Sequence, residues 1–316
     1  MVEVVRGGIV ESAHRGSVVV LDASGEVAAQ LGDISSAMYP RSALKPLQAA
    51  AMVRHGLSLE PRLLALAAAS HSGGTWHVAG VEEMLAQSGL HTDDLQCIEG
   101  LPLGSEERAA FVRDGGKPDR VHFNCSGKHA GFMATCIANG WSIDNYLEAS
   151  HPMQLAVRAV IEELCDERVG SATVDGCGAP LFAVSLAGLA RGFRAIAVAS
   201  AASPEGQVAT AMRAYPEMVG GVGREDTVAM QVMPGLIAKI GAEAVYAMAL
   251  PDGRACAIKI SDGAARGHQP VLRAVLSAWG LDDALLTKID VMPVLGGGQP
   301  VGGMRLASAA AEALRT

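Results

Sequence analysis

Residues 244–260 read AVYAMALPDGRACAIKI and predict a β-hairpin in the C-terminal part of the chain. The segments 244–250 and 255–260 are apolar enough to be buried strands. Pro251-Asp252-Gly253-Arg254 between them is a strong turn signal. This hairpin decides the fold class, because a second pair of strands is expected near the opposite end of the chain.

The N-terminal pair consists of residues 16–22 and 26–30, which flank a short turn that contains Gly25. The sequence between the two pairs is rich in alanine, and apolar residues recur in it at helical spacing. This spacing predicts helices at 43–55, 61–69, 78–88, 151–164 and 181–191, with a further helix at 269–279 after the second hairpin.

Strands at both ends with helices between them predict an α+β protein. We expect an antiparallel sheet that is built from both chain ends and flanked by helices, with a helical lobe inserted. Because no proline-rich or serine-rich linker interrupts the sequence, residues 1–316 are predicted to form a single unit. The sheet lobe would take residues 1–36 and 230–316, and the mainly helical lobe residues 37–229.

The composition excludes several classes of protein. Hydrophobic residues make up 50% of the 316, which supports a buried core and excludes disorder. The formal net charge of -8 argues against nucleic-acid binding, because phosphates require a basic surface. Apolar stretches such as 63–69 are far shorter than the ~20 residues that span a bilayer, and residues 1–8 lack the apolar core of a signal peptide. We therefore expect a cytoplasmic protein with no nucleic-acid or membrane partner.

Two glycine-rich stretches, 220–223 and 296–299, predict turns. Neither has the Lys-Ser/Thr of a P-loop, and neither fits the Gly-x-Gly-x-x-Gly pattern of a dinucleotide site. No organic cofactor is therefore indicated.

Ser42 and Lys45 are the first residues that suggest chemistry. They lie three apart at the predicted start of a helix, where Ser42 is a candidate N-cap, so their side chains are expected on one face. A lysine amine that is neutral can remove the proton of a serine hydroxyl and make it a nucleophile. Ser-x-x-Lys is the arrangement of the β-lactamases and penicillin-binding proteins. The Ser-x-x-Lys spacing alone is weak evidence for catalysis, and the alternative is a serine that caps the helix beside a solvated lysine.

A second serine–lysine pair supports the catalytic interpretation. Ser70 follows an alanine-rich helix, and Lys239 precedes the predicted strand 244–250 in a Lys-x-Gly sequence. That sequence resembles the Lys-Thr-Gly element of serine β-lactamases, in which the lysine pairs with a second serine beside the nucleophile. Ser72 and Lys259 are the alternatives for this second pair.

The cysteines form no disulfide framework, because the six are too few and too scattered. Cys125 and Cys177 stand out among glycine and polar residues, near His129 and Asp175 respectively. Cys, His and Asp are suitable ligands for Zn²⁺, but the spacing is not that of a zinc finger. A zinc site, substrate-binding loops and a reactive thiol all remain open. The other four cysteines lie in or beside apolar runs and are expected to act as small hydrophobes: Cys97, Cys136, Cys165 and Cys256.

The chain resembles the asparaginase II family, the rhizobial-type or class 3 L-asparaginases, over nearly its whole length. The resemblance is carried, in chain order, by PRSALKP at 40–46, SHSG at 70–73, NCSGKHAG at 124–131, DGCGAP at 175–180, KIGAE at 239–243 and KISDGAAR at 259–266. It implies hydrolysis of L-asparagine to L-aspartate and ammonia, a fold related to serine β-lactamases and glutaminases, and a homodimer.

The resemblance also implies roles for individual residues. Ser42 is the nucleophile and Lys45 its base, and Ser70 with Lys239 forms the second serine–lysine tandem. Arg41 is a candidate for binding the substrate's α-carboxylate, with a structural role as the alternative.

A zinc site near the substrate pocket is implied as well. Its protein ligands are Cys125, Lys128 and Cys177, and the site modulates or anchors the substrate. His129 and Asp175 are expected beside the metal, in contact with substrate or water.

Two other functions compete with the asparaginase. The nearer one is a related serine amidohydrolase, either a glutaminase or a penicillin-recognising hydrolase. The more distant one is a zinc-binding or redox-sensing protein without turnover, built on Cys125 and Cys177.

Overall fold

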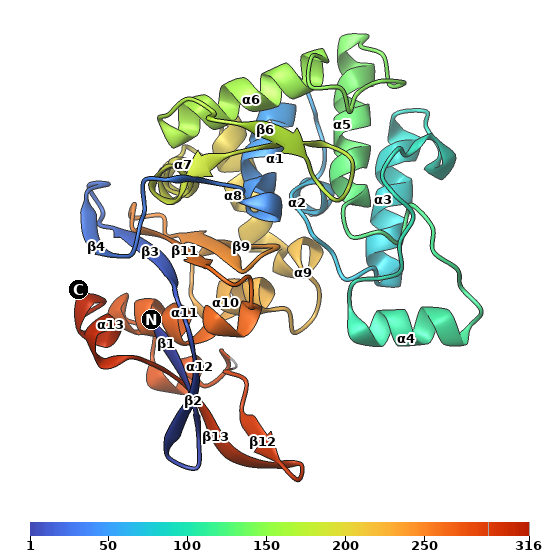
Figure 1. The fold of residues 1–316 in the computed structure, drawn as a ribbon. Coiled ribbons are helices and arrows are strands. Elements are labelled where there is room, and N and C mark those ends of the chain that lie inside the picture. The colour runs from blue at the N-terminus through green and yellow to red at the C-terminus, as the bar shows by residue number, and fades with distance from the viewer. Residues whose placement is uncertain (290, 316) are drawn as a thin grey trace.

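A computed structural model describes residues 1–289 and 291–315, and two antiparallel sheets take their strands from the two chain ends (Figure 1). The larger sheet has the strand order β4-β3-β11-β10-β9. Every residue of β10 is buried, because this strand lies inside the sheet between two neighbours. The strands are β3 (Gly16–Leu21), β4 (Val27–Leu31), β9 (Ile237–Gly241), β10 (Val245–Ala249) and β11 (Ala255–Ile260), and four of the five were predicted.

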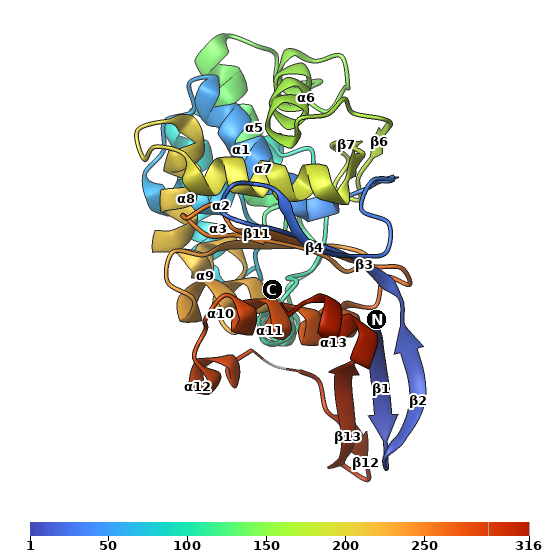
Figure 2. The same cartoon turned by 90° about the vertical axis from the view of Figure 1, so that its left-hand side faces the viewer.

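A second sheet, with the order β12-β13-β1-β2, extends away from the rest of the chain (Figure 2). Its strands are β1 (Val2–Arg6), β2 (Ile9–His14), β12 (Val294–Gly296) and β13 (Gln299–Leu306). The sequence analysis did not predict this sheet, because its strands are mostly exposed and lack a long apolar run. The predicted turn at 296–299 joins β12 to β13, and Gly297 and Gly298 adopt the positive φ values of 55° and 78° that this turn requires.

Helices cover both faces of the five-stranded sheet. The amphipathic helix α7 (Leu186–Val198) lies across one face and packs on β3, β10 and β11 (Figure 2). Helix α11 (Gln269–Ala278) lies below the opposite face in the same view. The α+β class, with an antiparallel sheet from both chain ends and flanking helices, is therefore confirmed.

The helical lobe is built around α1 (Lys45–Arg54), in which Lys45 to Met52 are all buried. Pro46 is tolerated there because it lies in the first turn, where no backbone N–H is needed. Among the described residues, five helices pack against α1: α7 and the four helices α2 (Pro61–Ala67), α5 (Ser126–Asn139), α6 (Pro152–Cys165) and α8 (Pro204–Ala214). The exact division into lobes at 1–36, 37–229 and 230–316 stays a prediction.

The remaining elements are short or peripheral. They are η1 (Arg41–Leu44), η2 (Thr92–Asp94), η3 (Ala265–Gly267), α3 (Thr75–Gln87), α4 (Ser105–Arg113), α9 (Pro216–Val219), α10 (Glu225–Val232), α12 (Asp283–Leu286), α13 (Ser308–Ala313), β5 (Ala37–Met38), β6 (Ala172–Val174), β7 (Pro180–Phe182) and β8 (Val184–Ser185). Across residues 1–289 and 291–315, each helix is too short or too polar to span a membrane.

Three local predictions were wrong. Ser42 does not cap a helix: it lies inside η1, whose N-cap position is Pro40. The helix expected at 181–191 begins only at Leu186, because β7 and β8 occupy the preceding residues and the Ser185 hydroxyl caps α7. Lys239 was expected just before a strand, whereas it lies in the middle of a strand of its own, β9, which precedes β10.

Candidate active site

Five chain segments bring the predicted site residues together. They are η1 with the start of α1, the segment after α2, the start of α5, the loop after β6, and strand β9. Gly241 at the end of β9 lies so close to η1 that a Cβ atom there would be 2.3 Å from the Pro40 carbonyl oxygen. This close approach places the Lys239 strand directly beside the Ser42 turn.

The Ser42 turn is held in an unusual backbone conformation. Arg41 has a φ of 55°, in the left-handed region that few residues other than glycine adopt. Its guanidinium donates to the Asp175 carboxylate at 2.7 Å, and the same carboxylate oxygen accepts from the backbone N–H of Gly176. Ser42 is partly exposed, and among the described residues its hydroxyl makes no hydrogen bond. A serine in this position is accessible to a substrate.

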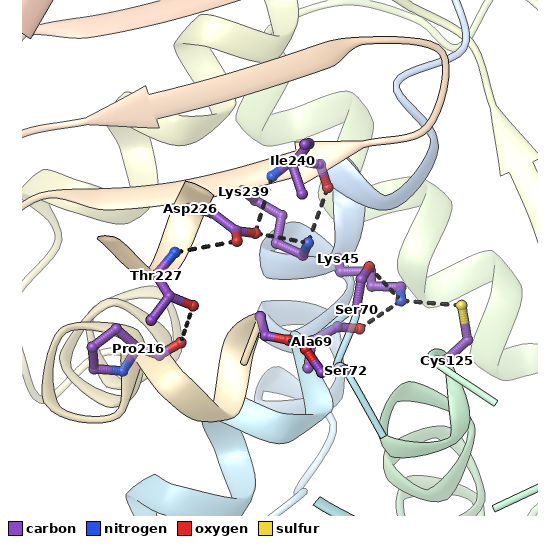
Figure 3. A network of polar contacts seen from close by, with 11 residues as sticks. Lys45, Ala69, Ser70, Ser72, Cys125, Pro216, Asp226, Thr227, Lys239 and Ile240 are labelled. Atoms are coloured by element: carbon purple, nitrogen blue, oxygen red, sulfur yellow. Dashed lines mark hydrogen bonds and ion pairs between the residues drawn. The ribbon is translucent and has the colours of Figure 1, made fainter. Parts of the chain in front are cut away.

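Lys45 lies buried next to Ser70, with 1% of its surface exposed. Its Nζ is 2.5 Å from the Ala69 carbonyl oxygen, 3.0 Å from Ser70 Oγ and 3.1 Å from Cys125 Sγ (Figure 3). Only the carbonyl must be an acceptor, because the hydroxyl and the thiol can each donate. The amine can therefore donate to Ala69 and exchange a proton with the Ser70 hydroxyl. No hydrogen bond joins Lys45 to Ser42 in the described part of the chain.

Lys239 is fully buried and is paired with Asp226 of α10 rather than with Ser70. Its Nζ donates to Asp226 Oδ2 at 3.3 Å and to the Ile240 carbonyl at 2.9 Å. Figure 3 shows this pair on one side of Lys45 and Ser70, with Cys125 on the other. No hydrogen bond between Ser70 and Lys239 occurs within residues 1–289 and 291–315.

Burial lowers the pKa of Lys239 to about 8. Asp226 opposes this shift, while the nearby cations Lys45 and Arg224 reinforce it. Burial would raise the pKa of Asp226, but Lys239 and Arg224 outweigh it and lower that pKa. Lys239 is thus a cation at neutral pH that loses its charge only slightly above it. Asp226 was missed by the sequence analysis because an acidic residue at the start of a helix is ordinary.

Ser72 and Lys259, the alternatives for the second pair, make other contacts. The Ser72 hydroxyl donates to the Gly220 carbonyl at 3.0 Å. Lys259 Nζ donates to the backbone carbonyls of Glu243 and Ile260, both at 2.6 Å. Neither side chain bonds to a member of the serine–lysine cluster.

The two cysteines form a buried cluster with Lys128 and His129. Lys128 Nζ lies 3.1 Å from Cys177 Sγ, and Cys125 also contacts Cys177. The hydrogen bond from Cys125, together with Lys128, lowers the pKa of Cys177, which indicates a thiolate. Burial lowers the pKa of His129, so its imidazole is neutral. Its Nδ1 is 2.7 Å from the Tyr146 hydroxyl, and its buried Nε2 has no partner among the described residues.

No group of three or more His, Cys, Asp and Glu side chains that could hold a metal ion occurs in residues 1–289 and 291–315. A metal at this cluster would therefore depend on the lysine as a ligand. The donors present are two sulfur atoms, the Lys128 amine and the unpartnered His129 nitrogen.

A partly exposed serine beside two buried lysines is a suitable arrangement for acyl transfer, because the amines can accept and return protons.

The solved structures that are similar to the chain have low TM-scores. A proposed β-lactamase from Bacteroides dorei DSM 17855 has a TM-score of 0.43 and 13% identity, covering 78% of this chain and 84% of that one. A β-lactamase from Mycobacterium bovis has a TM-score of 0.35 and 16% identity, covering 88% and 95%. Mglu in its native form has a TM-score of 0.37 and 13% identity, covering 85% and 62%. Likeness at this level carries no argument about the fold or the reaction.

The sequence itself is more informative. No curated protein matches the chain at a significant level. The family model for L-asparaginase II matches residues 2–306, which include every site residue discussed above. The chain therefore belongs to the L-asparaginase II family of hydrolases.

Proposed function

We propose that the protein hydrolyses the side-chain amide of L-asparagine through a covalent ester on Ser42. The observation that carries this proposal is the contact of 3.0 Å between Lys45 Nζ and Ser70 Oγ beside the accessible Ser42. A buried amine in contact with a hydroxyl can act as a base.

The reaction would proceed in two steps. Ser42 Oγ attacks the amide carbon while its proton passes to Lys45, directly or through the Ser70 hydroxyl. The tetrahedral intermediate collapses as the same proton is returned to the departing nitrogen, which leaves as ammonia. Water then attacks the β-aspartyl ester, its proton passes back through Lys45 to Ser42 Oγ, and L-aspartate is released. Lys239 would hold a positive charge beside this relay.

The wild-type protein is expected to release ammonia from L-asparagine faster than from L-glutamine, and to leave a chromogenic β-lactam intact. The three substrates separate the asparaginase from a glutaminase and from a penicillin-recognising hydrolase. The measurement is coupled ammonia detection, with absorbance for the β-lactam. Preferred turnover of glutamine or of the β-lactam would contradict the assignment, and no turnover of any of the three would favour the zinc-binding or redox-sensing alternative.

We also propose that Zn²⁺ binds at Cys125, Lys128 and Cys177. The donor set fits, because Lys128 Nζ lies 3.1 Å from Cys177 Sγ, Cys125 contacts Cys177, and the buried Nε2 of His129, the residue next to Lys128, has no partner among the described residues. A bound zinc ion would add a fixed positive charge that anchors an anionic or carbonyl group of the substrate. A homodimer stays a prediction from the family resemblance, and a cytoplasmic location stays a prediction from the sequence.

Protein purified without added metal is expected to contain one zinc ion per chain, and the Cys177→Ser variant none. The reason is that a hydroxyl is a much weaker zinc ligand than a thiolate. Cys256→Ser is a matched control, since Cys256 is fully buried in β11 and lies outside the cluster. Elemental analysis measures the metal directly, and equal zinc in the wild type and Cys177→Ser would remove Cys177 from the ligands.

A further inference from the structure

A cavity of about 680 Å³ lies between the first turn of α4 and the segment that leads into α10. Ser72 forms part of its lining and ties its two walls together: the Ser72 carbonyl accepts from the backbone N–H of Gly104 at 2.9 Å, and the Ser72 hydroxyl donates to the Gly220 carbonyl at 3.0 Å. Ser72 is only two residues from Ser70 (Figure 3). The lining of the cavity therefore comes within two residues of Ser70, and its volume is in the range of small-molecule sites.

Arg224 supplies the positive charge of this cavity. Its side chain is partly buried and lines the cavity, and it makes no ion pair or hydrogen bond with any other side chain or backbone group of the described residues. Arg224 occupies the N-cap position of α10, two residues before Asp226, and its positive charge lowers the pKa of both Asp226 and Lys239. Arg41 differs from Arg224, because the Arg41 guanidinium already forms an ion pair with Asp175.

The wall contributed by α4 carries the opposite charge. Glu106 and Glu107 in the first turn of α4 line the cavity and form no ion pair within the described residues. An anion is repelled from this wall and attracted to Arg224. The indole of Trp76 and the side chain of Val222, which are 41% and 72% exposed, complete an apolar rim.

An α-amino acid presents both charges that this cavity could bind. We propose that Arg224 binds the α-carboxylate of the substrate and that Glu106 and Glu107 face its α-ammonium group, so that the cavity selects zwitterionic amino acids. This inference rests on the proposed amide hydrolysis at Ser42. Arg224 would then be a binding residue for the part of the substrate that does not react, and Arg41 a residue that positions the Ser42 turn.

The test compares L-asparagine with its α-N-methylamide, in which a neutral amide replaces the α-carboxylate. The wild type is expected to prefer L-asparagine by about 10- to 100-fold in kcat/KM, the usual effect of one charge-assisted hydrogen-bonded pair. Arg224→Gln is expected to lose this preference, chiefly through a higher KM for L-asparagine. Because the methylamide lacks only the α-carboxylate, any effect of Arg224 on Lys239 changes kcat/KM for both substrates equally and cancels from their ratio.

Two control variants sharpen the result. Arg113→Gln removes an exposed arginine at the far end of α4 and should keep the wild-type preference. Arg224→Lys keeps the charge and should restore part of the preference, and it also serves if Arg224→Gln fails to fold. Retention of the full preference by Arg224→Gln would overturn the inference, as would its loss in Arg41→Gln alone.

A binding measurement separates this inference from the proposed reaction. L-aspartate should bind the wild type in calorimetry, and its affinity should fall by about 10- to 100-fold in Arg224→Gln, whether or not either protein turns over L-asparagine. Equal affinities in the two proteins would overturn the role of Arg224. Absence of ammonia release by the wild type, with aspartate binding still dependent on Arg224, would instead contradict the reaction proposed for Ser42.

Discussion

Replacing Ser42 with alanine is expected to reduce ammonia release from L-asparagine by a factor of about 10³ or more. The loss follows from the proposed chemistry, because without the hydroxyl no ester can form and the lysine pair has no nucleophile to activate. The fold should be unaffected, since the Ser42 hydroxyl makes no hydrogen bond in the described part of the chain and an alanine occupies less space. The measurement is kcat/KM for L-asparagine, together with the thermal unfolding midpoint as a check on folding.

Ser58→Ala is a matched control, because Ser58 is exposed and lies far along the chain from the cluster. Ser70→Ala gives the most informative comparison, since Lys45 bonds to Ser70 and not to Ser42. Full activity of Ser42→Ala with complete loss in Ser70→Ala would mean that Ser70 is the nucleophile. Large losses in both variants would agree with an attacking Ser42 and a relaying Ser70.

Removing the carboxylate of Asp226 is expected to cost about 3–5 kcal/mol of unfolding free energy in Asp226→Ala, because Lys239 would be left as a buried charge without a partner.

The Asp226→Asn variant keeps the shape of the side chain and tests the electrostatic effect of the carboxylate on the reaction. Asp226 raises the pKa of Lys239 against the effects of burial, Lys45 and Arg224, so its loss lowers that pKa below about 8. If the relay uses the charged form of Lys239, the alkaline limb of the kcat/KM profile should move to lower pH in Asp226→Asn.

Stability and activity should respond to pH in opposite directions. The folded-state pKa of Lys239 is about 8, below the value of 10.5 for an unburied lysine, so the unfolded chain binds more protons between these values. The contribution of Lys239 to the unfolding free energy therefore becomes more favourable to folding as the pH rises from about 8 to 10.5. Activity should fall over the same range. Comparison with Lys239→Met isolates this contribution from that of other titrating groups.

Asp252→Asn is the control for the electrostatic experiment, because Asp252 forms an ion pair with Arg254 in an exposed turn. Its pH profile should match that of the wild type. An alkaline limb that stays in place in Asp226→Asn would show that the carboxylate does not act through Lys239. If the pH profiles of Asp226→Asn, Lys239→Met and the double variant all matched the wild-type profile, both residues would be removed from the relay.

The sequence allowed the fold class and the neighbourhood of the site to be predicted, but not the pairing inside it. The hairpin at 244–260 was predictable because Pro251 and Gly253 separate two apolar runs. The exposed sheet of β1, β2, β12 and β13 was not, since its strands lack the apolar pattern that identifies buried strands.

The partners of the two lysines depend on long-range packing. Lys45 lies three residues from Ser42, yet its amine meets Ser70, which is 25 residues away along the chain. Lys239 was expected beside Ser70, whereas Asp226 from a separate helix takes that place. Sequence spacing indicates which groups share a region, but it does not specify the rotamers that decide which groups touch. Asp226 and Arg224 offered no signal of their own, because charged residues at a helix start are common.

The left-handed backbone at Arg41 has a mechanical consequence for the whole site. A non-glycine residue in that conformation costs roughly 1–2 kcal/mol, and the ion pair with Asp175 helps to offset the cost. Asp175 belongs to the same loop as Cys177, only two positions earlier. The cysteine cluster and the Ser42 turn are therefore connected through Asp175. A ligand that displaces Cys177 is expected to shift Asp175 and, through its ion pair with Arg41, the position of the Ser42 hydroxyl.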